Sequence, residues 1–222
     1  MIYTTQLFDL AHSIARPLLE RFEAPWEALA CIKAYILEIG PGLDPETFDH
    51  PSEDVWIAKS AKIAPTACLN GPLIVDEGAE IRHCAFVRGS AIVGKNAVVG
   101  NSTELKNCIL FDAVQVPHFN YVGDSILGYK AHTGAGAITS NVRSDKKNIV
   151  VHADSEIETG LRKFGAMLGD RAEVGCNSVL NPGSIVGRDS IVYPCSCVRG
   201  VVPENSIFKT GGKIVKRENG RD

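Results

Sequence analysis

Large apolar residues recur at every sixth position over much of this chain. Nine successive positions at this spacing, from Ile57 to Leu105, are all Ile, Leu or Val. A second column, four places after the first, holds small residues such as Ala61, Ala79 and Ala97. An α-helix would repeat every 3.6 residues and an isolated strand every 2. A period of six therefore predicts a short strand followed by a corner, with the large residue inside and the small residue beside the turn.

The six-residue ladder extends beyond Leu105 with two shortened steps. Five residues separate Leu105 from Leu110 and Val122 from Leu127, and the period resumes between Leu168 and Val198. Three strand-and-corner units make one coil, and stacked coils lie about 4.8 Å apart as parallel strands. Such a hexapeptide repeat predicts a mainly β fold, a parallel β-helix at 51–205, with a loop extruded at 140–162. We expect the β-helix to be left-handed, because β-helices built from this class of repeat normally are.

The ends of the chain have a different character. Two runs at helical spacing predict a helical segment at 1–50. Their apolar residues are Leu7, Leu10, Ile14, Leu18, Leu19, Leu29, Ile32, Ile36 and Leu37. We expect this helical pair to cover one open end of the prism or to pack on a partner subunit. Residues 206–222 form a short basic tail.

Composition and charge exclude several classes of protein. The chain has 222 residues, of which 45% are hydrophobic and 22% charged, which is ordinary for a folded domain. A net charge of −3 favours neither nucleic acid nor a membrane surface as the partner. No apolar run is long enough to cross a bilayer and no secretory signal opens the chain, so we expect a cytoplasmic protein. The seven cysteines include no CxxC pair, and we expect no metal.

The repeat also assigns polar side chains to faces of the prism. Glu104 and Tyr121 are each sixth in their hexads, and Arg88 and Lys106 are each second. With His118, which is third in its hexad, they are expected near one outer corner, within about 10 Å.

These residue types suit proton transfer beside an anion. A histidine such as His118 can take a proton from an amine near neutral pH, and Glu104 can orient the imidazole. Arg88 and Lys106 offer positive charge to a phosphate. The alternative is a surface histidine beside a solvated pair.

Two further segments have a ligand-binding character. The run AHTGAGAITSN at 131–141 lacks the Gly-Lys-Ser/Thr of a phosphate loop, but it fits a tight wall for a flat or extended ligand. The loop that follows carries Arg143, Lys146 and Lys147, which can hold phosphate or remain solvated.

The segments STELKNC, VPHFNYVGDS and TGAGAITSN resemble a known family in order and spacing. They are similar to the acetyltransferase domain of the bacterial bifunctional glucosamine-1-phosphate acetyltransferase/N-acetylglucosamine-1-phosphate uridyltransferase. The segments ETGLRKFGAMLGD and VGCNSVLNPGS resemble related sugar-phosphate nucleotidylyltransferase/acetyltransferases. The likeness covers about residues 55–205.

The resemblance implies roles for individual residues. His118 matches the catalytic base and Glu104 the carboxylate that supports it. The residues that match sugar-phosphate ligands of the family are Arg88, Lys106, Tyr121 and Lys147. Asn141 matches a substrate-binding asparagine, and His132, which stands where the family has another asparagine, is expected to contact the substrate as well. Ala135 and Gly175 match backbone positions that contact acetyl-CoA, and the family forms homotrimers.

The expected function is acetyl-CoA-dependent N-acetylation of an amino-sugar phosphate or nucleotide amino-sugar, in UDP-N-acetylglucosamine metabolism. Val142 replaces a family tyrosine, and the nucleotidyltransferase domain has no counterpart, so we expect no such activity from this chain. The main alternative is a non-catalytic nucleotide-sugar-binding or scaffold protein. A metal hydrase of the γ-carbonic anhydrase type is a third alternative, but His83 and His118 lie two coils apart, too far for one zinc ion.

Overall fold

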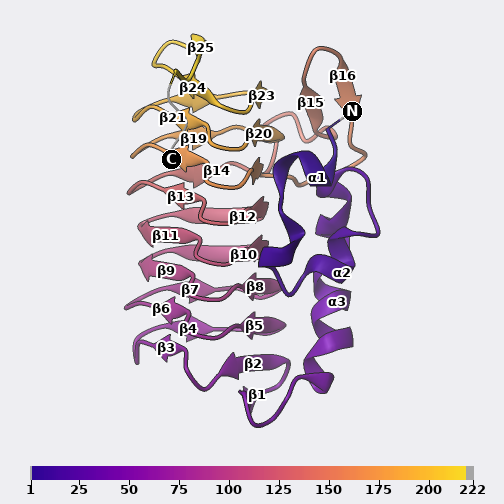
Figure 1. The fold of residues 1–222 in the computed structure, drawn as a ribbon, viewed down its shortest axis with the longest axis vertical. Helices are drawn as coiled ribbons and strands as arrows, with labels where there is room; N and C mark the ends of the chain where they lie inside the picture. Colours follow the sequence, from indigo (N-terminus) through magenta and orange to yellow (C-terminus); the bar gives the residue numbers. More distant parts are fainter. Residues whose placement is uncertain (1, 219–222) are drawn as a thin grey trace.

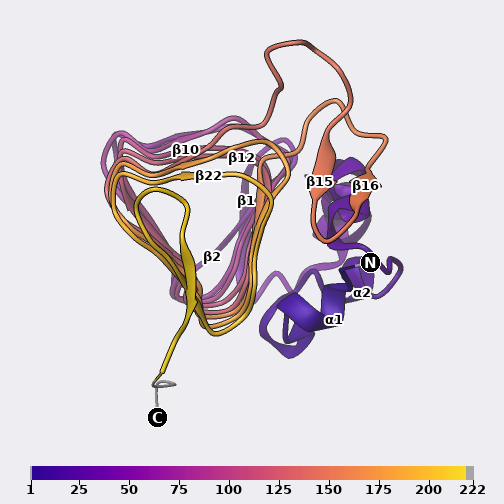
Figure 2. The same ribbon diagram turned by 90° about the horizontal axis from the view of Figure 1, so that it is seen from above.

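The computed structural model describes residues 2–218, and its main body is a parallel β-helix with three faces (Figures 1 and 2). The first face contains β2 (Val55–Ala58), β5 (Leu73–Val75), β8 (Ala91–Val93), β17 (Ala166–Leu168), β20 (Ser184–Val186) and β23 (Val201–Val202). The second face contains β3 (Lys62–Ile63), β6 (Glu80–Ile81), β9 (Val98–Asn101), β11 (Gln115–His118), β13 (His132–Thr133), β18 (Glu173–Val174), β21 (Ile191–Val192) and β24 (Ser206–Phe208). The third face contains β4 (Cys68–Leu69), β7 (Phe86–Val87), β14 (Ile138–Thr139), β19 (Val179–Leu180) and β22 (Cys197–Val198). The longer β10 (Glu104–Leu110) and β12 (Tyr121–Leu127) follow the third face and then bend onto the first.

The strand register confirms the ladder, including its shortened steps. On the first face Val75 pairs with Val93, which pairs in turn with Leu110. Leu110 then pairs with Leu127, and Leu127 with Leu168. These side chains are fully buried, so the large residue of each unit fills the interior of the prism as the period predicts.

The corners of the prism are built from left-handed backbone. Non-glycine residues with φ between 47° and 58° stand directly before the small inward residue of successive units. In the first coils they are Cys84, Ser90, Asn96, Ser102, Asn107, Ala113, Phe119, Asp124 and Lys130. Because single residues in this region bend the chain sharply, each one makes a corner of the prism, and Asn107 and Asp124 do so within β10 and β12.

An N-terminal layer of short helices covers the first face. It comprises α1 (Thr4–Leu7), η1 (Leu10–His12), α2 (Arg16–Leu19), η2 (Pro25–Ala30), α3 (Ile32–Ile39) and η3 (Gly40–Gly42). The predicted helical segment is present, but each of its two runs is divided into shorter helices, because Pro17 and Pro25 each lie in the first turn of a new helix.

The position expected for this layer is also corrected. The layer lies along the side of the prism and not over an open end, with α3 against β8 and β10 and η2 against β12 (Figure 2). Buried Ile32 and Ile36 form part of the common core, and the Asp170 carboxylate accepts hydrogen bonds from the backbone of Asp9 and Tyr129. Apolar burial against the first face thus decides where the layer packs.

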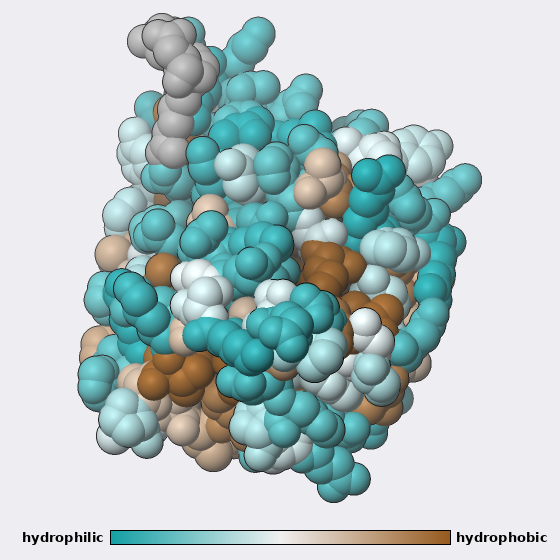
Figure 3. Space-filling view, turned by 60° about the horizontal axis from the view of Figure 1, so that its bottom comes forward, coloured by the Kyte–Doolittle hydropathy of each residue, from teal (hydrophilic) through white to brown (hydrophobic). Residues whose placement is uncertain are grey.

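Other segments cover the ends of the prism. At one end β1 (Phe48–Ser52) pairs antiparallel with β2, and at the other β25 (Ile214–Lys216) pairs antiparallel with β24. The expected tail at 206–222 therefore contains strands, while residues 219–222 lie outside the described part. With the β1 end turned forward, the surface is mostly hydrophilic and its apolar residues lie in separate patches (Figure 3).

The predicted extruded loop leaves the prism between β14 and β17. It carries an antiparallel hairpin of β15 (Val150–His152) and β16 (Glu156–Glu158) (Figure 1). Within residues 2–218, no helix has both the length and the apolar character that a membrane span requires.

Candidate functional site

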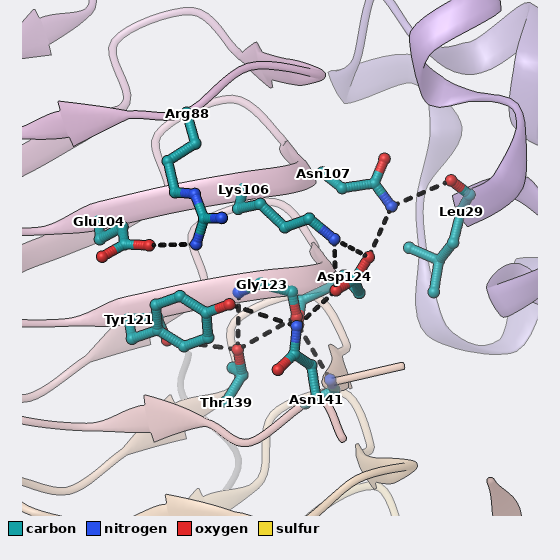
Figure 4. Close-up of polar contacts among 12 residues, drawn as sticks. Leu29, Arg88, Glu104, Lys106, Asn107, Tyr121, Gly123, Asp124, Thr139 and Asn141 are labelled. Atoms are coloured by element: carbon teal, nitrogen blue, oxygen red, sulfur yellow. Dashed lines mark hydrogen bonds and ion pairs between the residues drawn. The ribbon is translucent and has the colours of Figure 1, made fainter. Parts of the chain in front are cut away.

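A polar cluster lies on the third face, where this face turns into the first (Figure 4). The Asp124 carboxylate is its centre, and only 3% of the residue is exposed. Lys106 Nζ donates to both carboxylate oxygens, at 2.8 and 2.9 Å. The side-chain amides of Asn107 and Asn141 also donate to Asp124. A buried carboxylate that accepts from several donors holds each of those side chains in place.

Asp124 and Asn107 were not predicted as site residues, although the sequence carries a signal for them. Both occupy the left-handed corner at a five-residue step, with φ of 47° and 48°. Asn107, Asp124 and Asn141 follow one another at intervals of 17 residues, which is one shortened coil. The interval therefore stacks the three polar side chains at one edge.

Tyr121 lies beside this cluster on β12. Its hydroxyl accepts a hydrogen bond from Asn141 Nδ2 at 3.2 Å. Gly123 makes room for the ring, because a Cβ there would come within 2.6 Å of Tyr121 Cζ. Burial raises the pKa of the Tyr121 phenol, as do the charges of Asp124 and Glu104. The hydroxyl therefore stays protonated near neutral pH and can donate to a ligand.

Arg88 and Glu104 form an ion pair at 3.0 Å on the same face. The expected stacking of Glu104 beside Tyr121 is confirmed by their register. The orienting role expected for Glu104 is not seen, because its carboxylate binds Arg88 and no hydrogen bond joins it to His118 within residues 2–218. Arg88 lies one coil from Lys106. Its guanidinium, and not the His118 imidazole, is the partner of the Glu104 carboxylate.

His118 ends β11 at the corner between the second and third faces, and its side chain is exposed. The corner is fixed from behind by Asn120, which is 3% exposed. Asn120 Oδ1 accepts from the backbone N–H of His118 at 3.1 Å, and its Nδ2 donates to the Gly134 carbonyl at 2.8 Å. Among the residues described, the His118 imidazole has no hydrogen-bond partner, so both ring nitrogens are open to a ligand.

The predicted acetyl-CoA contacts share this corner. The Gly136 N–H donates to the carbonyl of His118, so the glycine run lies one coil from the histidine. Ala135 accepts from the Asn177 N–H in the next coil, close to Gly175. This corner therefore brings the exposed imidazole of His118 close to the half-exposed small residues Ala135 and Gly136.

Two further predicted residues lie on the second face and in the extruded loop. His132 is on β13 of the second face, in register with Gln115 and Glu173. Lys147 is exposed in the extruded loop, where its backbone N–H donates to Asp145. Their predicted roles remain predictions.

No candidate metal site is present in the part of the chain that the structure describes. Within residues 2–218 no three His, Cys, Asp or Glu side chains are placed to hold one ion. His83 and His118 do stack with Asn101 between them, as the repeat predicts.

The fold and the corner define a hexapeptide-repeat β-helix protein, and comparison with known proteins supports that class. The chain belongs to the family described as the GMPPB C-terminal domain, whose profile matches residues 69–209. The bifunctional protein GlmU of Methanococcus maripaludis is 30% identical over 207 residues, covering 84% of this chain and 50% of that protein. A bifunctional sugar-1-phosphate nucleotidylyltransferase/acetyltransferase of Sulfurisphaera tokodaii is 31% identical over 160 residues, covering 64% and 40%. These relatives confirm the predicted resemblance, and the chain spans about half the length of the first of them.

A crystal structure of the polySia-specific acetyltransferase NeuO shares the fold. It has a TM-score of 0.52 and 15% identity, and the match covers 73% of this chain and 82% of that one. At this identity the likeness establishes the β-helix and nothing finer.

Proposed function

We propose that this protein is an acetyl-CoA-dependent N-acetyltransferase whose acceptor is an amino-sugar phosphate or a nucleotide amino-sugar. The observation that carries the proposal is the exposed His118 imidazole at a corner that Asn120 holds by hydrogen bonds. This corner borders the face that bears Lys106 and Arg88. The name of one relative, bifunctional sugar-1-phosphate nucleotidylyltransferase/acetyltransferase, supports the same class.

In the proposed reaction His118 takes the proton from the acceptor amine as the nitrogen attacks the thioester carbonyl. The C–N bond forms, the C–S bond breaks, and the coenzyme A thiolate leaves and is protonated by the imidazolium. Backbone N–H groups of the glycine run are available to stabilise the oxyanion. Lys106, held by Asp124, and Tyr121 position the sugar phosphate.

We further propose that the working unit is a homotrimer in the cytoplasm. The layer of helices covers the first face, whereas Phe86, Phe119, Ile138 and Tyr193 expose apolar surface on the third face and its corner with the second. His118 and Asp124 lie at opposite edges of the third face, so the corner of a neighbouring prism can complete the site. Sedimentation should give three times the 23.9 kDa chain mass, and a monomer would contradict this part.

The reaction is tested with acetyl-CoA and a panel of hexosamine phosphates and UDP-hexosamines, with the N-acetylated product detected by mass spectrometry. We expect one class to be acetylated with turnover. If acetyl-CoA or UDP-N-acetylglucosamine binds and no amine is acetylated, the protein is a non-catalytic binding module.

A further inference from the structure

A cleft of about 520 Å³ lies between the extruded loop and the third face. Its volume is in the range typical of small-molecule sites. Ser140, Asn181 and Arg199 line it from the prism, and Arg143 and His152 line it from the loop. None of these residues was predicted to bind a ligand except Arg143, as a possible phosphate contact.

The cleft lies on the column of outward-facing residues that also contains Lys106, in which each coil contributes one residue. The register places Lys106 beside Gly123 and Asn181 beside Arg199, and the Ser140 N–H donates to the carbonyl of Leu180 in the Asn181 coil. Lys106 and Arg199 are four coils apart in this column, about 19 Å at the usual spacing. The positions between them are uncharged.

Arg199 carries the unbalanced charge of the cleft. Its guanidinium donates to His152 Nε2 at 2.9 Å, and within residues 2–218 it has no carboxylate partner. The other cation, Arg143, is bound to both carboxylate oxygens of Asp145. The other ring nitrogen of His152, Nδ1, lies 3.3 Å from the Glu156 carboxylate. The free edge of Arg199 can therefore bind an anion.

We propose that this cleft is a second phosphate-binding site, which receives the nucleotide end of a ligand whose other end lies near Lys106 and Tyr121. The proposal rests on the proposed function for the identity of that ligand. A hexosamine 1-phosphate is much shorter than the span, so it cannot occupy both cationic ends. Two ligands can reach the cleft, namely acetyl-CoA through its phosphorylated adenosine and a nucleotide amino-sugar through its diphosphate.

Isothermal titration with adenosine 3′,5′-bisphosphate and with UDP tests the site without any turnover. Arg199→Gln should weaken at least one probe about tenfold, as expected for a lost charge-assisted hydrogen bond. Weaker binding of the adenosine bisphosphate alone assigns the cleft to acetyl-CoA, and weaker binding of UDP alone assigns it to the acceptor.

Arg82→Gln is the matched control, because Arg82 is a surface arginine that is paired with Glu80 near β6 of the second face. It should leave both affinities unchanged. Wild-type protein that binds neither probe at millimolar concentration, or Arg199→Gln with unchanged affinities, overturns the proposal. Because the readout is binding, either result stands whether or not the protein acetylates an amine.

Discussion

Asn107 joins the layer of helices to the polar cluster, and its removal should affect both. Its Nδ2 donates to the Leu29 carbonyl of η2 at 3.1 Å and to Asp124 Oδ1 at 2.9 Å (Figure 4). Asn107→Gly removes this bridge and keeps the backbone conformation, since φ is 48° and glycine adopts it without strain.

The magnitude follows from the two hydrogen bonds. A bond to a neutral carbonyl contributes about 1 kcal/mol and one to a carboxylate about 1.5–3 kcal/mol, part of which water restores at this half-exposed position. We expect the free energy of unfolding to fall by about 2 kcal/mol. The KM for the acceptor should rise several-fold while the KM for acetyl-CoA stays unchanged, because Asp124 no longer holds Lys106 and Asn141 as firmly.

Urea denaturation and initial-rate kinetics measure both effects. Asn96→Gly is the control, because Asn96 occupies another left-handed corner at φ 55° and its exposed side chain makes no hydrogen bond among the residues described. Equal stability and equal acceptor KM in the two variants would refute the bridging role of Asn107.

Three other predictions concern the core and the cluster. Lys106→Met should lower the free energy of unfolding by about 2 kcal/mol, because it leaves the buried Asp124 carboxylate without its cation. Adding Asp124→Asn to this variant should restore part of the lost stability. Denaturation curves of Lys106→Met that match those of the wild type would contradict this prediction. Burial raises the pKa of Cys108 to about 12, so iodoacetamide at pH 8 should label it only after unfolding, and mass spectrometry that finds it labelled in the native protein would be inconsistent with the core. A Cβ at Gly100 would meet the backbone of Pro117 in the neighbouring coil, so Gly100→Ala should clearly lower the melting temperature. Gly42→Ala is the control, because Gly42 has open space around it. Equal melting temperatures of the two variants would show that the coils can separate.

The sequence predicts the prism well because its period is a direct consequence of the fold. Every sixth side chain must fill the interior, so both the regular steps and the two shortened ones can be found in the sequence, and the register confirms them. The N-terminal layer is less predictable. Its leucines and isoleucines indicate an apolar side, but which face of the prism they cover depends on tertiary contacts such as the one between Asp170 and the backbone of Asp9.

The candidate site was only partly predictable for the same reason. The repeat places Arg88, Lys106 and Tyr121 on one face, because outward positions follow from the period. It does not say that Glu104 pairs with Arg88 or that Asp124 organises the cluster, because ion pairing depends on side-chain conformation and burial.

The central claim is that His118 accepts the proton of the acceptor amine. The direct measurement is kcat/KM of His118→Ala against wild type, on the amine that the panel identifies. A positioned general base contributes about 10²–10⁴-fold, so the account predicts a loss of that size with acetyl-CoA binding and melting temperature unchanged, since the side chain is exposed. Retention of wild-type kcat/KM in His118→Ala would contradict the account.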